Sequence, residues 1–134
     1  MVKVRMAALP ILVLALHASN PAAAAEASRQ DSRDRKIFDL LDENHDGVVS
    51  MPEFKNNQML IFYLMDRNKD QVLVSGETNL PPDAFDRIAG PGGKINTMEF
   101  LSIVDEAFKR ADTNQDTTID RKEFNALTQR VRGR

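Results

Sequence analysis

Residues 42–53 read Asp-Glu-Asn-His-Asp-Gly-Val-Val-Ser-Met-Pro-Glu, and this stretch decides what fold to expect from the rest of the chain. It matches the pattern D-x-[DN]-x-[DN]-G-x5-E at every constrained position. Alternating carboxylate and amide side chains of this kind supply several oxygens to one hard cation, and Ca²⁺ takes about six to eight of them. Glycine at the sixth position permits the sharp turn that such a loop needs. The stretch therefore predicts a calcium-binding loop, called loop 1 below.

Each constrained position of loop 1 has an expected role in holding the ion. The expected oxygen donors are Asp42, Asn44, Asp46, the carbonyl of Val48, Ser50 through a water molecule, and Glu53. Glu53 stands at the twelfth position, at the start of the helix that follows, and is expected to bind with both carboxylate oxygens.

The same pattern recurs further along the chain. In loop 2, residues 66–77, the expected ligands are Asp66, Asn68, Asp70, the carbonyl of Val72, and Glu77. In loop 4, residues 112–123, they are Asp112, Asn114, Asp116, the carbonyl of Thr118, Asp120 and Glu123. Loop 3, residues 88–99, is degenerate, because only its second half survives and its first half lacks ligand side chains. A solvated acidic turn would explain one such loop, but three beside a relic favour calcium.

These four loops resemble those of the EF-hand calcium-binding family, and the resemblance covers about residues 35–127. It implies a helical fold, Ca²⁺ as the bound ion, and the ligands given above. The compact spacing of the loops and the signal-like first residues are similar to those of small exported bacterial EF-hand proteins. We expect no ligands from loop 3, and the order of affinity loop 1, loop 4, loop 2, because Thr117 and Gln71 replace the turn glycine in loops 4 and 2.

An offset of 46 residues relates the first two loops to the last two. It carries loop 1 onto loop 3, loop 2 onto loop 4, and Phe62 onto Phe108. A tandem duplication of a two-loop unit explains this, with one unit at 35–80 and the other at 81–134. If the units pack with two-fold symmetry, loop 1 is expected to face loop 3, and loop 2 to face loop 4.

Within each unit the two loops stand too close together for separate helices between them. Residues 54–65 and 100–111 are the only connections, so we expect one shared helix in each unit, over 51–65 and 97–111. Further helices are expected over 29–41, 82–88 and 121–131 from their apolar periodicity. The predicted fold is therefore all-α, with five helices around four loops.

The first 25 residues have the layout of a secretory signal peptide. Lys3 and Arg5 precede an apolar run over 7–16, and small residues follow at 22–25. The run is shorter than the ~20 residues that span a bilayer, although a retained anchor is the alternative. Residues 26–34 are expected to form a flexible segment. The predicted location is the periplasm or the extracellular space, without disulfides or a lipid-bearing cysteine, since the chain has no cysteine.

Composition and motifs offer no support for an enzyme or a nucleic-acid-binding protein. Lys and Arg number 18 against 20 Asp and Glu, and the basic residues are scattered. His17 lies in the signal segment and His45 at a solvent-facing loop position, so no Ser has an evident His partner. The predicted function is calcium binding by a buffer or a calcium-stabilised module. The alternatives are a sensor that exposes an apolar groove to a protein partner, and a secreted enzyme or inhibitor stabilised by calcium.

Overall fold

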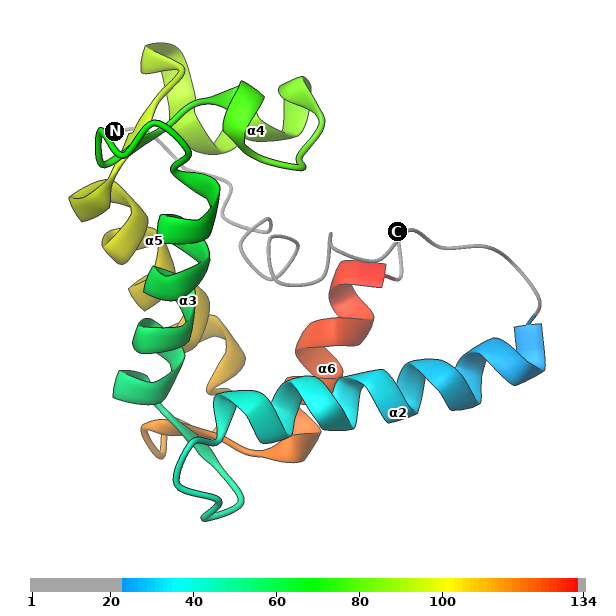
Figure 1. Cartoon of the computed structure of the whole chain (residues 1–134). Helices are drawn as coiled ribbons and strands as arrows, with labels where there is room; N and C mark the ends of the chain where they lie inside the picture. Colours follow the sequence, from blue (N-terminus) through cyan, green and yellow to red (C-terminus); the bar gives the residue numbers. More distant parts are fainter. Residues whose placement is uncertain (1–22, 133–134) are drawn as a thin grey trace.

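The computed structural model describes residues 23–132, and the prediction of a signal peptide falls mainly outside them. Within this part the fold is mainly helical, as predicted (Figure 1). The α-helices are α2 Ala23–Leu41, α3 Met51–Met65, α4 Pro82–Ala89, α5 Thr97–Ala111 and α6 Arg121–Arg132. The short strands are β1 Val49–Ser50, β2 Val72–Leu73, β3 Ile95–Asn96 and β4 Thr118–Ile119, and the 3₁₀ turns are η1 Ser75–Glu77 and η2 Gly90–Gly92. None of the helices in residues 23–132 is long and apolar enough to cross a membrane.

Local sequence signals define both ends of the two shared helices. α3 begins with a capping box, in which Ser50 accepts from the amide of Glu53 and the Glu53 side chain accepts from the amide of Ser50. α5 begins in the same way with Asn96 and Glu99. Each helix then runs without a break into the first residue of the next loop. Both helices therefore have the bounds predicted from the sequence, 51–65 and 97–111.

The shared helices α3 and α5 lie side by side and antiparallel, and they connect the part of the molecule that holds α4 to the part that holds α2 and α6 (Figure 1). The ring of Phe54, near the start of α3, meets Phe108 near the end of α5 with centroids 5.6 Å apart. Phe62, near the end of α3, meets Phe100 near the start of α5 at 4.9 Å. All four rings are buried, and one hydrophobic core joins both halves of the chain.

The pairing of the loops differs from the prediction. β1 of loop 1 pairs with β4 of loop 4, and Val49 lies opposite Ile119. β2 of loop 2 pairs with β3 of loop 3, and Leu73 lies opposite Ile95. The predicted pairings of loop 1 with loop 3 and of loop 2 with loop 4 are therefore wrong. They would require parallel shared helices, whereas antiparallel helices place the start of α3 beside the end of α5.

The N-terminal helix also differs from the expectation. α2 begins at Ala23 and not near 29, so residues 26–34, expected to be flexible, are helical in the structure. Its last turns bury Phe38 and Leu41 in the core. Leu40, in the same turn, is 72% exposed.

Candidate metal centre

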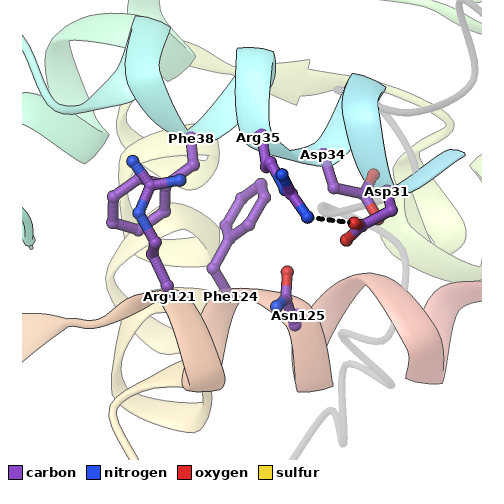
Figure 2. Close-up of a pocket in the computed structure, with 7 residues that line it drawn as sticks. All are labelled: Asp31, Asp34, Arg35, Phe38, Arg121, Phe124 and Asn125. Atoms are coloured by element: carbon purple, nitrogen blue, oxygen red, sulfur yellow. Dashed lines mark hydrogen bonds and ion pairs between the residues drawn. The ribbon is translucent and has the colours of Figure 1, made fainter. Parts of the chain in front are cut away.

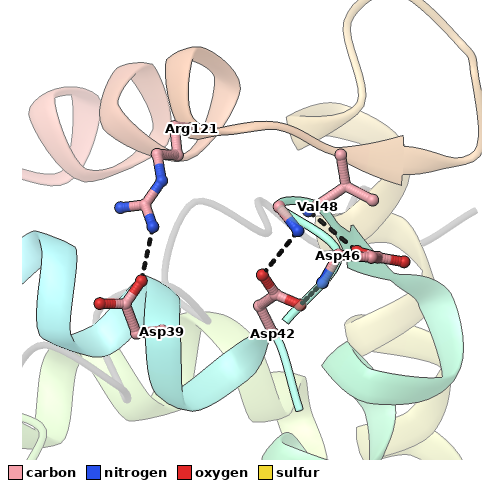
Figure 3. A network of polar contacts seen from close by, with 6 residues as sticks. Asp39, Asp42, Asp46, Val48 and Arg121 are labelled. Atoms are coloured by element: carbon pink, nitrogen blue, oxygen red, sulfur yellow. Dashed lines mark hydrogen bonds and ion pairs between the residues drawn. The ribbon is translucent and has the colours of Figure 1, made fainter. Parts of the chain in front are cut away.

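Loop 1 is organised by its own carboxylates. Asp42, at the end of α2, is buried and accepts hydrogen bonds from two backbone amides, those of Asp46 at 3.0 Å and Gly47 at 2.9 Å. Asp46 in turn accepts from the amide of Val48 at 3.1 Å (Figure 3). Asn44 Oδ1 accepts from the amide of Asp46 at 2.9 Å. These bonds wrap the backbone around the side chains at positions 1, 3 and 5 of the loop.

Loops 2 and 4 repeat these hydrogen bonds position by position. In loop 4, Asp112 accepts from the amides of Asp116 and Thr117 at 3.1 and 3.0 Å. In loop 2, Asp66 accepts from the amides of Asp70 and Gln71 at 3.2 and 2.9 Å. The three stretches chosen by sequence pattern therefore share one local fold.

The turn at the sixth position has the left-handed backbone that the sequence predicted. Gly47, Gln71 and Thr117 have φ angles of 91°, 63° and 71°. A Cβ added at Gly47 would meet no atom within 4 Å, so the backbone angle favours glycine there and crowding does not. The β-branched Thr117 is the most strained of the three residues.

A second left-handed residue, at the fourth position of each loop, was not anticipated. It is His45 in loop 1, Lys69 in loop 2 and Gln115 in loop 4, with φ angles of 58°, 61° and 61°. No glycine or asparagine marks this position, so composition gave no signal for it. His45 is exposed, in agreement with the solvent-facing role expected for it.

The closing glutamates of loops 1 and 4 are held more tightly than that of loop 2. Glu53 is buried and accepts from the amide and hydroxyl of Ser50 at 2.8 and 2.7 Å. Glu123 is buried and accepts from the amides of Thr113 and Asp120 at 2.8 and 3.1 Å. Glu77 stands on the short turn η1 and accepts its bonds at 3.2 and 3.4 Å. The order of calcium affinity, with loop 2 weakest, stays a prediction.

Hydrogen bonding lowers the pKa of the closing glutamates of loops 1 and 4. Burial acts to raise the pKa of Glu53, but hydrogen bonds from Ser50, Asn44 and Glu43 outweigh it and lower the pKa below its ordinary value. The pKa of Glu123 is lowered against burial in the same way. The unfolded value is near 4.5. The stability gained from these bonds is therefore present above that pH and is lost as pH falls through the lowered folded values.

The donor set fits a hard divalent cation, although the carboxylates are not gathered around one point. Within the described residues, no three His, Asp or Glu side chains stand together so as to hold a metal ion. They accept backbone hydrogen bonds instead. Every expected donor is an oxygen, which is the ligand type that Ca²⁺ selects. Each ionised carboxylate has two oxygens with about four lone-pair sites, so it could accept these amides and still offer an oxygen to a cation.

Most residues of loop 3 belong to helices and a strand of the fold. Ile88, where a first ligand would stand, belongs to α4 and is 4% exposed in the core. Glu99, at the closing position, accepts from the amide of Asn96 at 2.9 Å within the capping box of α5. Glu99 therefore serves as a capping residue at the N-terminus of α5. Loop 3 supplies a strand to loop 2 and a start to α5.

The two loops joined by β1 and β4 are also the ones that a family comparison recognises. Residues 35–60 and 103–128 match the family model described as EF hand. These two matches support the resemblance of the chain to the EF-hand calcium-binding family. The first matched segment contains loop 1 and the second contains loop 4, while loops 2 and 3 lie outside both segments. None of the curated proteins compared with the chain matches it.

Thr117→Gly is expected to tighten calcium binding at loop 4 several-fold. The change removes strain on the order of 1 kcal/mol at the left-handed sixth position, and the greater freedom of the unliganded glycine loop offsets part of this gain. Through the β1–β4 ribbon, loop 1 is expected to gain a smaller improvement, and loop 2 none. NMR titration resolved by loop measures all three affinities.

Gln71→Gly is the matched change at the other end of the molecule. It is expected to improve loop 2 and to leave loops 1 and 4 unchanged, because β2 pairs with β3. A response of loop 2 to Thr117→Gly would contradict the ribbon pairing seen in the structure.

Proposed function

We propose that the protein binds calcium at loops 1 and 4 as a side-by-side pair, with loop 2 as a weaker third site, and acts as a buffer or a calcium-stabilised module. One observation carries the proposal. The two EF hands are joined as an antiparallel ribbon, and each holds the same oxygen-rich loop in the same hydrogen-bonded form. Calcium at such loops stabilises the folded state by mass action.

Three features favour a buffer over a sensor. The strand pairs β1–β4 and β2–β3 hold the shared helices α3 and α5 together, one pair at each end. The ring pairs Phe54–Phe108 and Phe62–Phe100 join the same two helices along their length. Between α2 and α6 there is a small cavity of about 140 Å³ (Figure 2). Its lining is mostly charged or polar, with two aromatic rings: Asp31, Asp34, Arg35, Phe38, Arg121, Phe124 and Asn125. This is a poor surface for an apolar partner helix.

The sensor alternative has one observation in its favour. Leu60, Tyr63 and Leu64 of α3 are 57%, 61% and 73% exposed, at helical spacing on one stretch of the helix. A sensor would expose further apolar surface on binding calcium. An apolar fluorescent dye, titrated with calcium and with chelator, separates the two functions. A buffer is expected to give equal dye fluorescence in both conditions.

The proposal includes a tandem duplication and an exported location. The duplication is supported by pairs of contacts whose members are shifted by 46 residues. Val49–Ile119 becomes Ile95–Leu73, and Phe54–Phe108 becomes Phe100–Phe62. Export is supported by the signal-like layout of residues 1–25. In calcium-rich surroundings, sites with affinities of about 10⁻⁴–10⁻³ M are useful. Cell fractionation of the full chain, followed by N-terminal sequencing, tests export and cleavage near residue 25.

Calorimetric titration of the protein without residues 1–25 tests the proposed calcium binding directly. We expect two or three calcium ions per chain, because three loops carry full sets of oxygens and loop 3 does not. Mg²⁺ is expected to compete poorly, since it requires a smaller octahedral site. A stoichiometry of zero contradicts the proposed function, and a stoichiometry of four contradicts the structural role of loop 3.

A further inference from the structure

We propose that Arg121 is a positioning residue that couples calcium binding at loop 4 to calcium binding at loop 1. The inference rests on the proposed function and names a connection between the two sites besides the β1–β4 ribbon. It is carried by the contacts of one side chain, which lies in loop 4 and reaches the helix that leads into loop 1.

Arg121 reaches across from α6 to α2 through two contacts. Its Nη2 lies 2.6 Å from Oδ1 of Asp39 (Figure 3). Its guanidinium carbon stands 4.6 Å from the ring centroid of Phe38 (Figure 2). Phe38 is buried, and its ring packs edge-on against Phe124 of α6 at 5.5 Å. The guanidinium is therefore fixed in direction by a carboxylate and a ring at once.

Arg121 and its partners on α2 lie close in the sequence to expected calcium ligands of loops 4 and 1. Arg121 is the tenth residue of loop 4 and the first of α6, two positions before Glu123. Phe38 and Asp39 lie in the last turn of α2, and the carbonyl of Phe38 accepts from the amide of Asp42 at 2.9 Å. Glu123 would hold a calcium ion at loop 4, and any shift of Glu123 on binding would be shared by the turn of α6 that carries Arg121. Arg121 would in turn pass such a shift to the helix end that carries Asp42.

The connection belongs to the loop 1–loop 4 end of the molecule. At the other end, the residues shifted by 46 from Arg121 and Asp39 are Ser75 and Phe85, and neither is charged. Loop 2 and loop 3 are instead linked by a hydrogen bond from the Thr97 hydroxyl to the carbonyl of Gln71 at 3.2 Å. The ion pair therefore occurs only at the end where both loops carry ligands.

Because the ion pair between Arg121 and Asp39 is exposed, it is expected to affect the coupling between the two calcium sites more than the stability of the fold. The side chains of Arg121 and Asp39 are 50% and 56% exposed, and exposed ion pairs contribute little to folding. Loss of the pair is therefore expected to change how the two sites communicate more than how firmly the protein folds. Salt screens such pairs, so the coupling is also expected to weaken as ionic strength rises.

The test compares Arg121→Met with Lys122→Met in the full chain. Lys122 is exposed on the next position of α6, and in the described part of the chain it forms no ion pair, so its replacement removes the same charge without the contacts. Calcium affinity at loop 1 is measured by loop-resolved NMR titration, with loop 4 intact and with loop 4 disabled by Glu123→Gln. The ratio of these two affinities is the coupling. The loss of a nearby positive charge changes the loop 1 affinity equally whether loop 4 is intact or disabled. Its effect therefore cancels in the ratio.

Arg121→Met is expected to reduce the coupling at least threefold, and Lys122→Met to leave it within the error of the wild type. Asp39→Asn removes the same pair from α2. It is expected to reduce the coupling to the same level, alone or combined with Arg121→Met. In calcium-free protein, Arg121→Met is expected to shift the amide resonance of Asp42, and Lys122→Met is not.

Equal coupling in Arg121→Met and Lys122→Met overturns the inference while leaving calcium binding in place. Arg121→Lys keeps the cation and is expected to retain part of the coupling, which loss of packing alone would not allow. A wild-type chain that binds no calcium at loops 1 and 4 overturns the proposed function, and the coupling with it.

Discussion

Replacing Glu53 by Gln is expected to weaken calcium binding at loop 1 by about 10–100-fold, which corresponds to about 1.4–2.7 kcal/mol. The carboxylate is the only ligand of the loop expected to give two oxygens, and the amide offers one oxygen without charge. Glu53 also accepts from the amide of Asn44 at 3.2 Å and from Ser50, and an amide nitrogen turned toward these donors would repel them. Loop-resolved NMR or calorimetric titration measures the change.

Glu99→Gln is the matched control for this prediction. Glu99 stands 46 residues later, is the third residue of α5 as Glu53 is of α3, and forms the same capping box. The control therefore removes the same charge at the same helix position without removing an expected ligand, and glutamine can still accept from the N-cap amide. We expect Glu99→Gln to lower the thermal stability slightly and to leave the calcium affinities within about twofold of the wild type. Equal losses of calcium affinity from the two substitutions would mean that loop 3 binds calcium after all.

Glu53→Gln is also expected to weaken loop 4, through the ribbon and the Arg121 connection. Loop 2 is expected to keep its affinity. The pairing of Val49 with Ile119 makes loop 4 the neighbour of loop 1. A selective loss at loop 2 would be incompatible with the observed pairing.

Phe62→Ala is expected to lower the free energy of unfolding by about 3–5 kcal/mol in the absence of calcium. The Phe62 ring is fully buried and packs against Phe100 at the crossing of the two shared helices. Small domains are stable by only about 5–15 kcal/mol, so a large part of the stability is at risk. Urea unfolding in chelator, followed by circular dichroism, measures the loss.

Leu64→Ala on the same helix is the control, because Leu64 is 73% exposed. It is expected to change the free energy of unfolding by less than about 0.5 kcal/mol. Calcium is expected to restore part of the stability of Phe62→Ala, since it binds the folded state alone. A loss from Phe62→Ala no greater than that from Leu64→Ala would contradict the burial of Phe62 in the core.

Much of the loop geometry and helix structure could be predicted from the sequence, because the interactions that set it are local. The capping pairs Ser50–Glu53 and Asn96–Glu99 are three residues apart and start the shared helices. The first aspartate of each loop bonds amides four and five residues away, so loop conformation follows from twelve consecutive residues. The left-handed fourth position escaped prediction because His45, Lys69 and Gln115 share no local preference for it.

The pairing of the loops was decided by tertiary structure alone. Both shared helices carry apolar residues at helical spacing, and this spacing is compatible with parallel or antiparallel packing of the two helices. The choice depends on which rings meet between residues that lie far apart in the sequence. Phe54 meets Phe108 and Phe62 meets Phe100 only if the helices run in opposite directions. The ion pair between Arg121 and Asp39 depends on the same choice, because it joins residues 82 apart. The sequence by itself therefore determined the loops and the shared helices, and the ligands of the loops stay a prediction. Long-range packing of the phenylalanines determined which loop lies beside which.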